Sequence, residues 1–220
     1  MGSNRGVVIA IDGPAGAGKS TVAKALAKEL GLRYLDTGAM YRALALKATR
    51  RHLGPLDGDE VAALGPSTRI DFEPGEPQRV LLDGEDVTDA IRTQAIGQLA
   101  SELSTDSGVR KVLVQRQKEV VAQGGVILEG RDVTTVVAPN ADLKIYLTAS
   151  LEERASRRLK EFSAKGVTAD FMRVRHDMEE RDHRDITRED SPLTVAHDAH
   201  IVDSANMSPD QVVKAILALL

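Results

Sequence analysis

The sequence predicts an α/β protein in which helices cover a parallel central sheet and a small antiparallel insertion interrupts that pattern. Short apolar runs rich in β-branched residues, such as Val7–Ile11, are typical of strands that are buried on both faces of a parallel sheet. Segments with helical periodicity follow several of these runs. A turn-rich stretch between residues 68 and 87 departs from the pattern. With 220 residues, the chain suits one α/β domain with an insertion.

The first helix is predicted from Lys19, because Val22, Leu26 and Leu30 recur at a spacing of four, and Gly31 can end it. The last helix is predicted after Ser208, which is an N-cap residue followed by a proline and then by glutamine at the third helical position. Parallel strands are expected at residues 7–11, 33–35, 126–128, 143–147 and 201–202. Helices are expected at residues 19–30, 38–52, 94–103, 108–122, 151–162, 169–182 and 208–220.

The insertion is predicted from three short strand candidates at residues 68–72, 78–82 and 85–87. The turn clusters Pro74–Pro77 and Asp83-Gly84 separate them, which favours antiparallel pairing. The polar stretch Arg181–Pro192 is expected to form a loop.

Composition excludes several classes of protein. The chain has no cysteine, so disulfides, thiolate zinc sites and cysteine nucleophiles are absent. A net charge of −4 argues against a nucleic-acid binder that relies on general basicity, and 3% aromatic residues argue against base-stacking platforms. No apolar run has the length of a membrane span, and the N-terminus lacks the apolar core of a signal peptide. We therefore expect a cytoplasmic protein with no membrane and no nucleic-acid partner.

A glycine-rich segment between the first predicted strand and the first predicted helix matches the pattern G-x-x-x-x-G-K-[ST]. Its glycines let backbone N–H groups converge on phosphate oxygens, and the helix N-terminus favours negative charge. Lys19 would reach the β- and γ-phosphates, and the Ser20 hydroxyl would bind Mg²⁺. The residues predicted to bind ATP are Gly13, Pro14, Ala15, Gly16, Ala17, Gly18, Lys19, Ser20 and Thr21.

The motif does not say how the phosphate is used. The sequence has no Asn-Lys-x-Asp tetrapeptide, so a guanine-specific GTPase is disfavoured. A small-molecule kinase needs a second site and a cationic lid. Asp36–Arg42 and Glu129–Asp132 follow predicted strands at the edge where open α/β sheets bind ligands, and eight arginines lie between residues 154 and 188.

Each of these segments also has a purely structural interpretation. Asp36 and Thr37 can simply cap a helix, and Glu129–Asp132 can form a surface turn with a local ion pair. The arginine cluster can form a solvated, salt-bridged helical face. The five histidines show no metal-ligand spacing.

Four segments together resemble the bacterial cytidylate kinase family, and the resemblance covers nearly the whole chain. They are residues 12–21, 35–42, 130–137 and 181–188. The resemblance implies a P-loop three-layer sandwich that transfers the γ-phosphoryl group of ATP to CMP or dCMP, with Mg²⁺ as cofactor and a monomer as the oligomeric state. It implies a single domain over residues 1–220, with a core at about 5–66, 104–152 and 190–220. The monophosphate-binding insertion would span about 67–103, and the helical lid about 153–189.

The resemblance also carries site residues onto matching positions. The residues implied to bind CMP are Thr37, Arg42, Ser101, Arg110, Arg131, Asp132, Arg181, Asp185 and Arg188. The residues expected to act on the transferring group are Lys19, Arg131, Arg157 and Arg158. One departure is Thr134, where the family often has glycine, so the turn after Asp132 can differ here.

Two alternatives stay open from the residues alone. One is a kinase for another small acceptor, such as UMP or a hydroxylated metabolite. The other is a non-catalytic P-loop module that binds ATP, against which the second-site candidates argue. The role of Asp132 is also open, because it can face the base or orient Arg131.

Overall fold

The computed structural model describes residues 6–73, 75, 78–164 and 166–220. It divides the chain into two compact units, each of which is described by itself. The first unit comprises Met1–Tyr34 and Gln123–Leu220, and the second comprises Leu35–Ala122. The sequence-based division into core, insertion and lid stays a prediction.

The first unit is built on a five-stranded sheet with the order β2-β6-β1-β7-β8. The central strand β1 (Val8–Asp12) is fully buried and pairs in parallel with β6 (Val126–Gly130) and β7 (Leu143–Thr148). The edge strands are β8 (His200–Asp203), parallel to β7, and β2 (Arg33–Asp36), whose first two residues belong to this unit. Asp12 is in register with Gly130 and Tyr146, so these strands bring their carboxyl ends to one edge. The predicted parallel sheet is confirmed.

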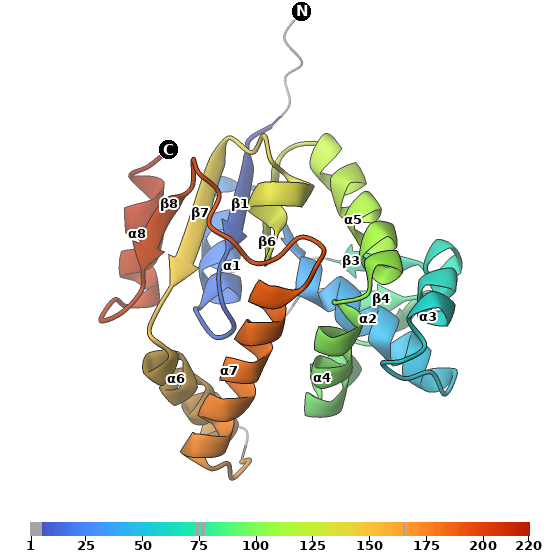
Figure 1. Ribbon diagram of the computed structural model, residues 1–220. Coiled ribbons are helices and arrows are strands. Elements are labelled where there is room, and N and C mark those ends of the chain that lie inside the picture. Colours follow the sequence, from blue (N-terminus) through green and yellow to red (C-terminus); the bar gives the residue numbers. More distant parts are fainter. Residues whose placement is uncertain (1–5, 74, 76–77, 165) are drawn as a thin grey trace, which may run out of the picture. The chain divides into compact units, whose positions relative to one another are not determined.

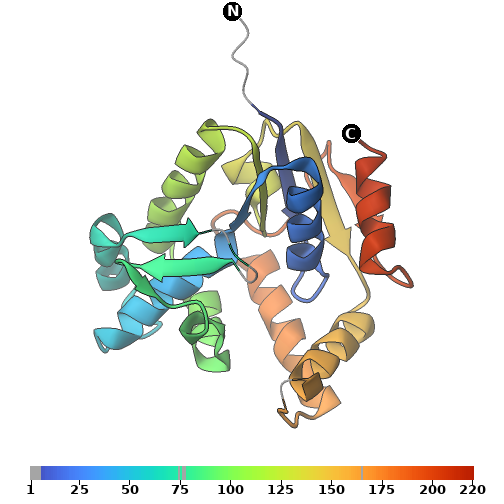
Figure 2. The ribbon, with the colours of Figure 1, turned by 180° about the vertical axis from the view of Figure 1, so that it is seen from behind.

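Two helices cover one face of this sheet, α1 (Lys19–Leu30) and α8 (Pro209–Leu217), and they lie side by side in Figure 2. Their apolar stripes and the sheet form the main core of the unit. Its members include Ile9, Ile11, Val22, Leu26, Ile127, Ile145, Val212 and Ile216. The capping box predicted at Ser208 and Gln211 is present, and the helix ends at Leu217, three residues earlier than expected.

The helices α6 (Leu151–Ala164) and α7 (Phe171–Thr187) pack against each other in the same unit (Figure 1). The prediction that α7 ends at Asp182 and that a loop begins at Arg181 is wrong, because the helix continues to Thr187. The buried stripe of α7 keeps helical spacing but changes from apolar to acidic along its length: it runs through Val174, Met178, Asp182 and Asp185. A pattern based on apolar residues therefore ends before the helix does.

The second unit combines helices with a three-stranded antiparallel sheet of order β3-β4-β5. The strands β3 (Ile70–Glu73), β4 (Arg79–Leu82) and β5 (Glu85–Asp86) confirm the antiparallel strands of the insertion. Asp83 and Gly84 both have positive φ, as expected for a two-residue turn of type I′ between paired strands. Of the predicted turn Pro74–Pro77, residues 74, 76 and 77 lie outside the described part of the chain.

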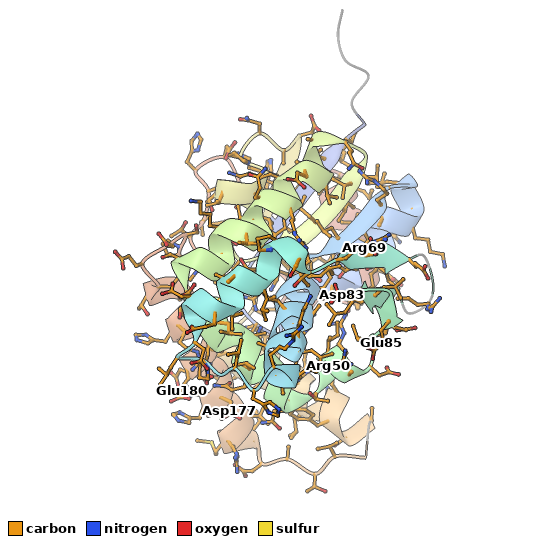
Figure 3. The ribbon with its side chains drawn as sticks, turned by 90° about the vertical axis from the view of Figure 1, so that its right-hand side faces the viewer. Arg50, Arg69, Asp83, Glu85, Asp177 and Glu180 are labelled. Carbon is orange, nitrogen blue, oxygen red and sulfur yellow. The ribbon has the colours of Figure 1, made fainter. Side chains whose placement is uncertain are left out.

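The helices of the second unit are α2 (Thr37–Arg50), α3 (Gly58–Leu64), α4 (Gln94–Leu103) and α5 (Ser107–Ala122). Short 3₁₀ turns lie at η1 (Gly65–Ser67) and η2 (Ala90–Arg92). Helix α3 was not expected from the sequence. Figure 3 shows Arg50 of α2 beside Glu85 of β5, and the two form a bidentate ion pair at 2.7 and 2.8 Å.

No helix in the described part of the chain is both long and apolar enough to cross a membrane.

Candidate functional site

The glycine-rich loop connects β1 to α1 at the carboxyl edge of the sheet, as predicted. Gly13 has a φ of 150°, and a Cβ at this position would lie 1.9 Å from the carbonyl oxygen of Leu147, so only glycine fits. Gly16 and Gly18 also have positive φ. Gly18 is the N-cap of α1 and gives it no side-chain cap. The N-terminus of α1 can therefore donate its N–H groups to a phosphate.

Lys19 is the buried cation of this loop. Its Nζ donates hydrogen bonds to the carbonyl oxygens of Gly13 at 2.8 Å and Pro14 at 2.7 Å. Burial lowers the pKa of Lys19 to about 7, with a further contribution from the positive charge of Arg131, while Glu129 and Asp12 oppose the shift. A phosphate beside this ammonium would favour its charged form.

Ser20 and Thr21 lie exposed in the first turn of α1. No group of three or more His, Cys, Asp or Glu side chains that could hold a metal ion occurs among the described residues. Mg²⁺ commonly keeps several waters and takes one or two protein ligands together with substrate phosphates. The exposed Ser20 hydroxyl, acting as the one protein ligand, fits that mode of binding, so the donor set here suits an ion that arrives with a nucleotide.

The two arginines predicted to act in the lid have different surroundings. Arg157 donates to Ser204 Oγ at 2.9 Å and to the Ser204 carbonyl oxygen at 2.7 Å, and it lies 3.5 Å from the carbonyl oxygen of Ala17 in the phosphate loop. Arg158 pairs with Glu161 at 2.8 Å and stacks over the ring of Phe162 at 4.5 Å. Arg157 is therefore the one of the two that contacts the phosphate loop here.

Four of the predicted CMP-binding residues come together in the first unit. Arg131 Nε donates to Asp185 Oδ2 at 2.7 Å, and Arg188 lies 3.6 Å from Asp132 and 3.8 Å from Asp185. Burial raises the pKa of Asp185, but Arg131, Arg181 and Arg188 outweigh it and hold the pKa below its ordinary value. The ionised carboxylate thus holds the Arg131 guanidinium by a hydrogen bond, and the Arg188 guanidinium is held beside it by two hydrogen bonds to the Ser191 carbonyl oxygen. Guanidinium groups held in this way suit the binding of a phosphate.

A buried carboxylate that the sequence did not single out supports this cluster. Asp12, the last residue of β1, accepts hydrogen bonds from the N–H groups of Val133 at 2.9 Å and Thr134 at 2.7 Å. These residues begin a π-helical turn, η3 (Val133–Val137), directly after Asp132. Asp12 therefore fixes the segment that carries Arg131 and Asp132, and it does so one residue before the phosphate loop.

The predicted residues of the second unit lie on α2, α4 and α5. Asp36 is the N-cap of α2 and accepts from the Ala39 N–H at 2.8 Å, which confirms the capping interpretation for Asp36. Thr37 is buried in the first turn of the same helix. Ser101 of α4 is buried, and its Oγ has no hydrogen-bond partner among the described residues. Arg110 of α5 donates to the Ser104 carbonyl oxygen at 3.3 Å and lies over the Tyr41 ring at 6.0 Å.

Asp36 also holds two guanidinium groups, one of which the sequence did not reveal. Its Oδ2 accepts from Arg42 at 2.9 Å and from Arg92 at 3.0 Å. Burial raises the pKa of Asp36, but Arg42 and Arg92 outweigh it and lower the pKa. Two arginines on one carboxylate leave a net positive charge, which suits an anion. Arg92 belongs to no recognisable motif, so nothing in the sequence pointed to it.

A phosphate loop at the carboxyl edge of a parallel sheet, together with ordered arginine clusters, defines a P-loop protein of the small-molecule kinase type. Two solved kinases share the fold at low sequence identity. A gluconokinase from Sinorhizobium meliloti 1021 has a TM-score of 0.51 at 15% identity and covers 97% of this chain and 90% of its own. A shikimate kinase from Acinetobacter baumannii has a TM-score of 0.50 at 15% identity, with 97% and 92% covered. These likenesses show the fold alone.

The chain belongs to the cytidylate kinase family, whose model matches residues 9–220. A curated cytidylate kinase from Listeria monocytogenes is 49% identical over 213 residues, which cover 97% of this chain and 95% of the relative. A cytidylate kinase from Desulforamulus reducens is 50% identical over 209 residues, with 95% and 94% covered. The family expected from the four sequence segments is thus confirmed.

Proposed function

We propose that this protein transfers the γ-phosphoryl group of ATP to CMP or dCMP, forming ADP and CDP or dCDP. The observation that carries the proposal is the phosphate loop with its buried Lys19, in a chain of the cytidylate kinase family. Gly13–Thr21 are the proposed ATP contacts, and membership of the family supports CMP or dCMP as the acceptor.

The acceptor needs no general base from the protein. A phosphate monoester is largely dianionic at pH 7 because its second pKa is about 6, so an oxygen of CMP can attack the γ-phosphorus directly. The contribution of the protein is to position the reactants and to stabilise charge on the transferring group. We assign that stabilisation to Lys19, Arg131, Arg157 and Arg158, and the contact between Arg157 and the phosphate loop supports its inclusion.

Mg²⁺, held by Ser20 and the ATP phosphates, would supply charge neutralisation at the β- and γ-phosphoryl oxygens. Lys19 would hold the same phosphates from the loop side, and the N–H groups at the start of α1 would orient them.

We assign CMP contacts to the residues that the family resemblance carries over. In the first unit the buried ion pairs of Arg131, Asp132, Asp185 and Arg188 supply preorganised guanidinium donors, and Arg181 adds charge beside them. In the second unit Arg42 would contact the phosphate, with Asp36 orienting it. The remaining proposed contacts there are Thr37, Ser101 and Arg110, and the buried Ser101 hydroxyl has donor and acceptor capacity to spare.

We propose that Asp132 sets the choice of base. An ionised carboxylate only accepts hydrogen bonds, so it matches the 4-amino group of cytosine and opposes the 4-carbonyl of uracil. Cytoplasmic location, a monomeric state and a lid over residues 153–189 complete the proposal.

The experiment is a test of acceptors. Purified protein is incubated with Mg-ATP and one acceptor at a time, and ADP formation is measured. The proposal expects stimulation by CMP and dCMP. Stimulation by a different acceptor only, or no acceptor effect at all, contradicts it.

A further inference from the structure

The apex of the phosphate loop is held by two charged side chains that the proposed function does not use. The N–H of Ala15 donates a hydrogen bond to Asp182 Oδ1 at 3.0 Å, and the carbonyl oxygen of Ala15 accepts one from Arg154 Nη1 at 2.9 Å. Arg154 lies on α6 and Asp182 on α7. Both backbone polar groups of Ala15 are therefore bound by the two helices.

The two side chains also bind each other. Arg154 Nη1 donates to Asp182 Oδ2, and Arg154 Nε donates to the carbonyl oxygen of Ala149 at 3.0 Å. Ala15, Arg154 and Asp182 are only 7 to 8% exposed. A buried pair whose donors and acceptors are satisfied holds its geometry, because breaking it leaves an uncompensated charge out of water.

Apolar packing reinforces the same connection. Ala15 forms a small core with Ala155 of α6 and with Val174 and Met178 of α7. A Cβ added at Gly16 would lie 2.6 Å from Met178 Cε and 3.3 Å from Arg154 Cβ, so the loop approaches both helices closely. The position of the loop apex is therefore determined by α6 and α7 and not by β1 and α1 alone.

Helix α7 also contacts Arg131, about one turn after its contact with the phosphate loop. Asp182 and Asp185 are three residues apart on its buried face, and Asp185 binds Arg131 at 2.7 Å. The same helix thus touches the phosphate loop through one carboxylate and Arg131 through the next. A shift of α7 would change the position of the loop relative to Arg131.

We propose that Arg154 and Asp182 are positioning residues for phosphoryl transfer, which fix Ala15 and so set the place of the phosphate-loop N–H groups and Lys19 relative to Arg131. The inference rests on the proposed function for its effect on turnover. Misplacing reacting groups by about 1 Å can cost about 100-fold in rate, so an anchor of this kind has a measurable effect.

The test uses the full chain with Arg154→Met, Asp182→Asn and the double variant. Binding of Mg-ADP is measured by calorimetry without acceptor, and kcat and the two KM values are measured with ATP and CMP. We expect each single variant to weaken Mg-ADP binding and to lower kcat, each by about tenfold or more, while KM for CMP changes by less than about threefold. The double variant should be no worse than the worse single variant, because the pair acts as a unit.

Removal of one partner from a buried pair can unfold the protein, so Arg154→Lys is the second variant. It keeps the charge beside Asp182 but cannot donate in the fork geometry that reaches the carbonyl oxygens of both Ala15 and Ala149. We expect it to fold and to show a smaller loss in the same direction, about threefold or more in Mg-ADP affinity.

Arg175→Met is the matched control. Arg175 of α7 also joins the two helices, by an ion pair with Glu152 of α6 at 3.1 Å, and its other hydrogen bond among the described residues goes to Glu179 at 3.0 Å and not to the phosphate loop. The affinity of Arg175→Met for Mg-ADP and its kcat should both stay within about twofold of the wild-type values. The proposal is overturned if Arg154→Met and Arg154→Lys bind Mg-ADP with the affinity of the wild type. It is also overturned if Arg175→Met loses as much Mg-ADP affinity as the Arg154 variants do. A wild type that binds Mg-ADP but does not phosphorylate CMP contradicts the proposed function instead, and the binding comparison still decides the role of the pair.

Discussion

Asp12 and Thr134 are joined by two hydrogen bonds, because Asp12 Oδ2 accepts both the Thr134 N–H at 2.7 Å and the Thr134 hydroxyl at 2.6 Å. Burial raises the pKa of Asp12 to about 6, and these bonds are the largest influence in the opposite direction. The family often has glycine at the position of Thr134, so the resemblance did not predict the conformation of the turn after Asp132. Here its side chain reaches back to the end of β1.

Removal of the hydroxyl should therefore change the titration of Asp12. We expect Thr134→Val to raise the pKa of Asp12 above about 6, since one of the bonds that stabilise the carboxylate is lost. The measurement is the ¹³C shift of the Asp12 carboxyl as a function of pH. Thr135→Val is the control, because the Thr135 hydroxyl bonds to the Asp132 carbonyl oxygen instead. An unchanged Asp12 midpoint in Thr134→Val would contradict the assignment.

The raised pKa of Asp12 also fixes the sign of a pH effect on stability. Because the folded state holds the proton more tightly than the unfolded state, the contribution of Asp12 is fully present below about pH 4 and is lost as pH rises through about 6. Between pH 5 and pH 8, we expect the free energy of unfolding to decrease more in Thr134→Val than in the wild type, because the pKa of Asp12 is higher in the variant. Urea unfolding at several pH values measures this, and a pH-independent difference would contradict it.

Arg92 provides a test of the second unit. Arg92→Met should raise the pKa of Asp36, because Arg92 is one of the two cations that lower it, and should raise KM for CMP by about tenfold or more. Carboxyl NMR and steady-state kinetics provide the two readouts. Arg69→Met is the control: Arg69 forms an exposed ion pair with Asp71 at 2.7 Å and should leave both readouts unchanged. If Arg92→Met shifts the pKa of Asp36 without changing KM, Arg92 has only a structural role.

Arg157 should act mainly on turnover. We expect Arg157→Met to lower kcat by about 100-fold or more and to change the affinity for CMP by less than about threefold, because its guanidinium lies beside the phosphate loop. Calorimetric binding of CMP and single-turnover kinetics separate the two effects. A loss of CMP affinity at unchanged kcat would contradict this role and would show that Arg157 binds the acceptor instead.

Asp132 should govern discrimination between bases. Asp132→Asn can present either an amide oxygen or an amide nitrogen, so we expect the preference in kcat/KM for CMP over UMP to narrow by about tenfold, or 1.4 kcal/mol. Equal losses for both substrates would show that Asp132 orients Arg188, from which it lies 3.6 Å, or Arg131 next to it in the chain.

Local patterns predicted much of this fold. The apolar strand β1, the glycines of the phosphate loop and the capping box at Ser208 depend on neighbouring residues, so the sequence displays them directly. The last turn of α7 was not predicted because Asp182 and Asp185 occupy its buried face. The bond between Asp12 and Thr134 joins residues 122 positions apart. Such tertiary pairings, and that of Arg92 with Asp36, leave no periodic signal in a single sequence.

The most direct test of the proposed function is the acceptor dependence of ADP formation, measured with wild type and Lys19→Ala under Mg-ATP. We predict that CMP and dCMP stimulate ADP formation by the wild type, and that the stimulation by UMP is weaker by about tenfold or more. Folded Lys19→Ala should lose several orders of magnitude in kcat. Near-normal turnover by Lys19→Ala, or ADP formation that does not respond to cytidine monophosphates, would contradict the proposed function.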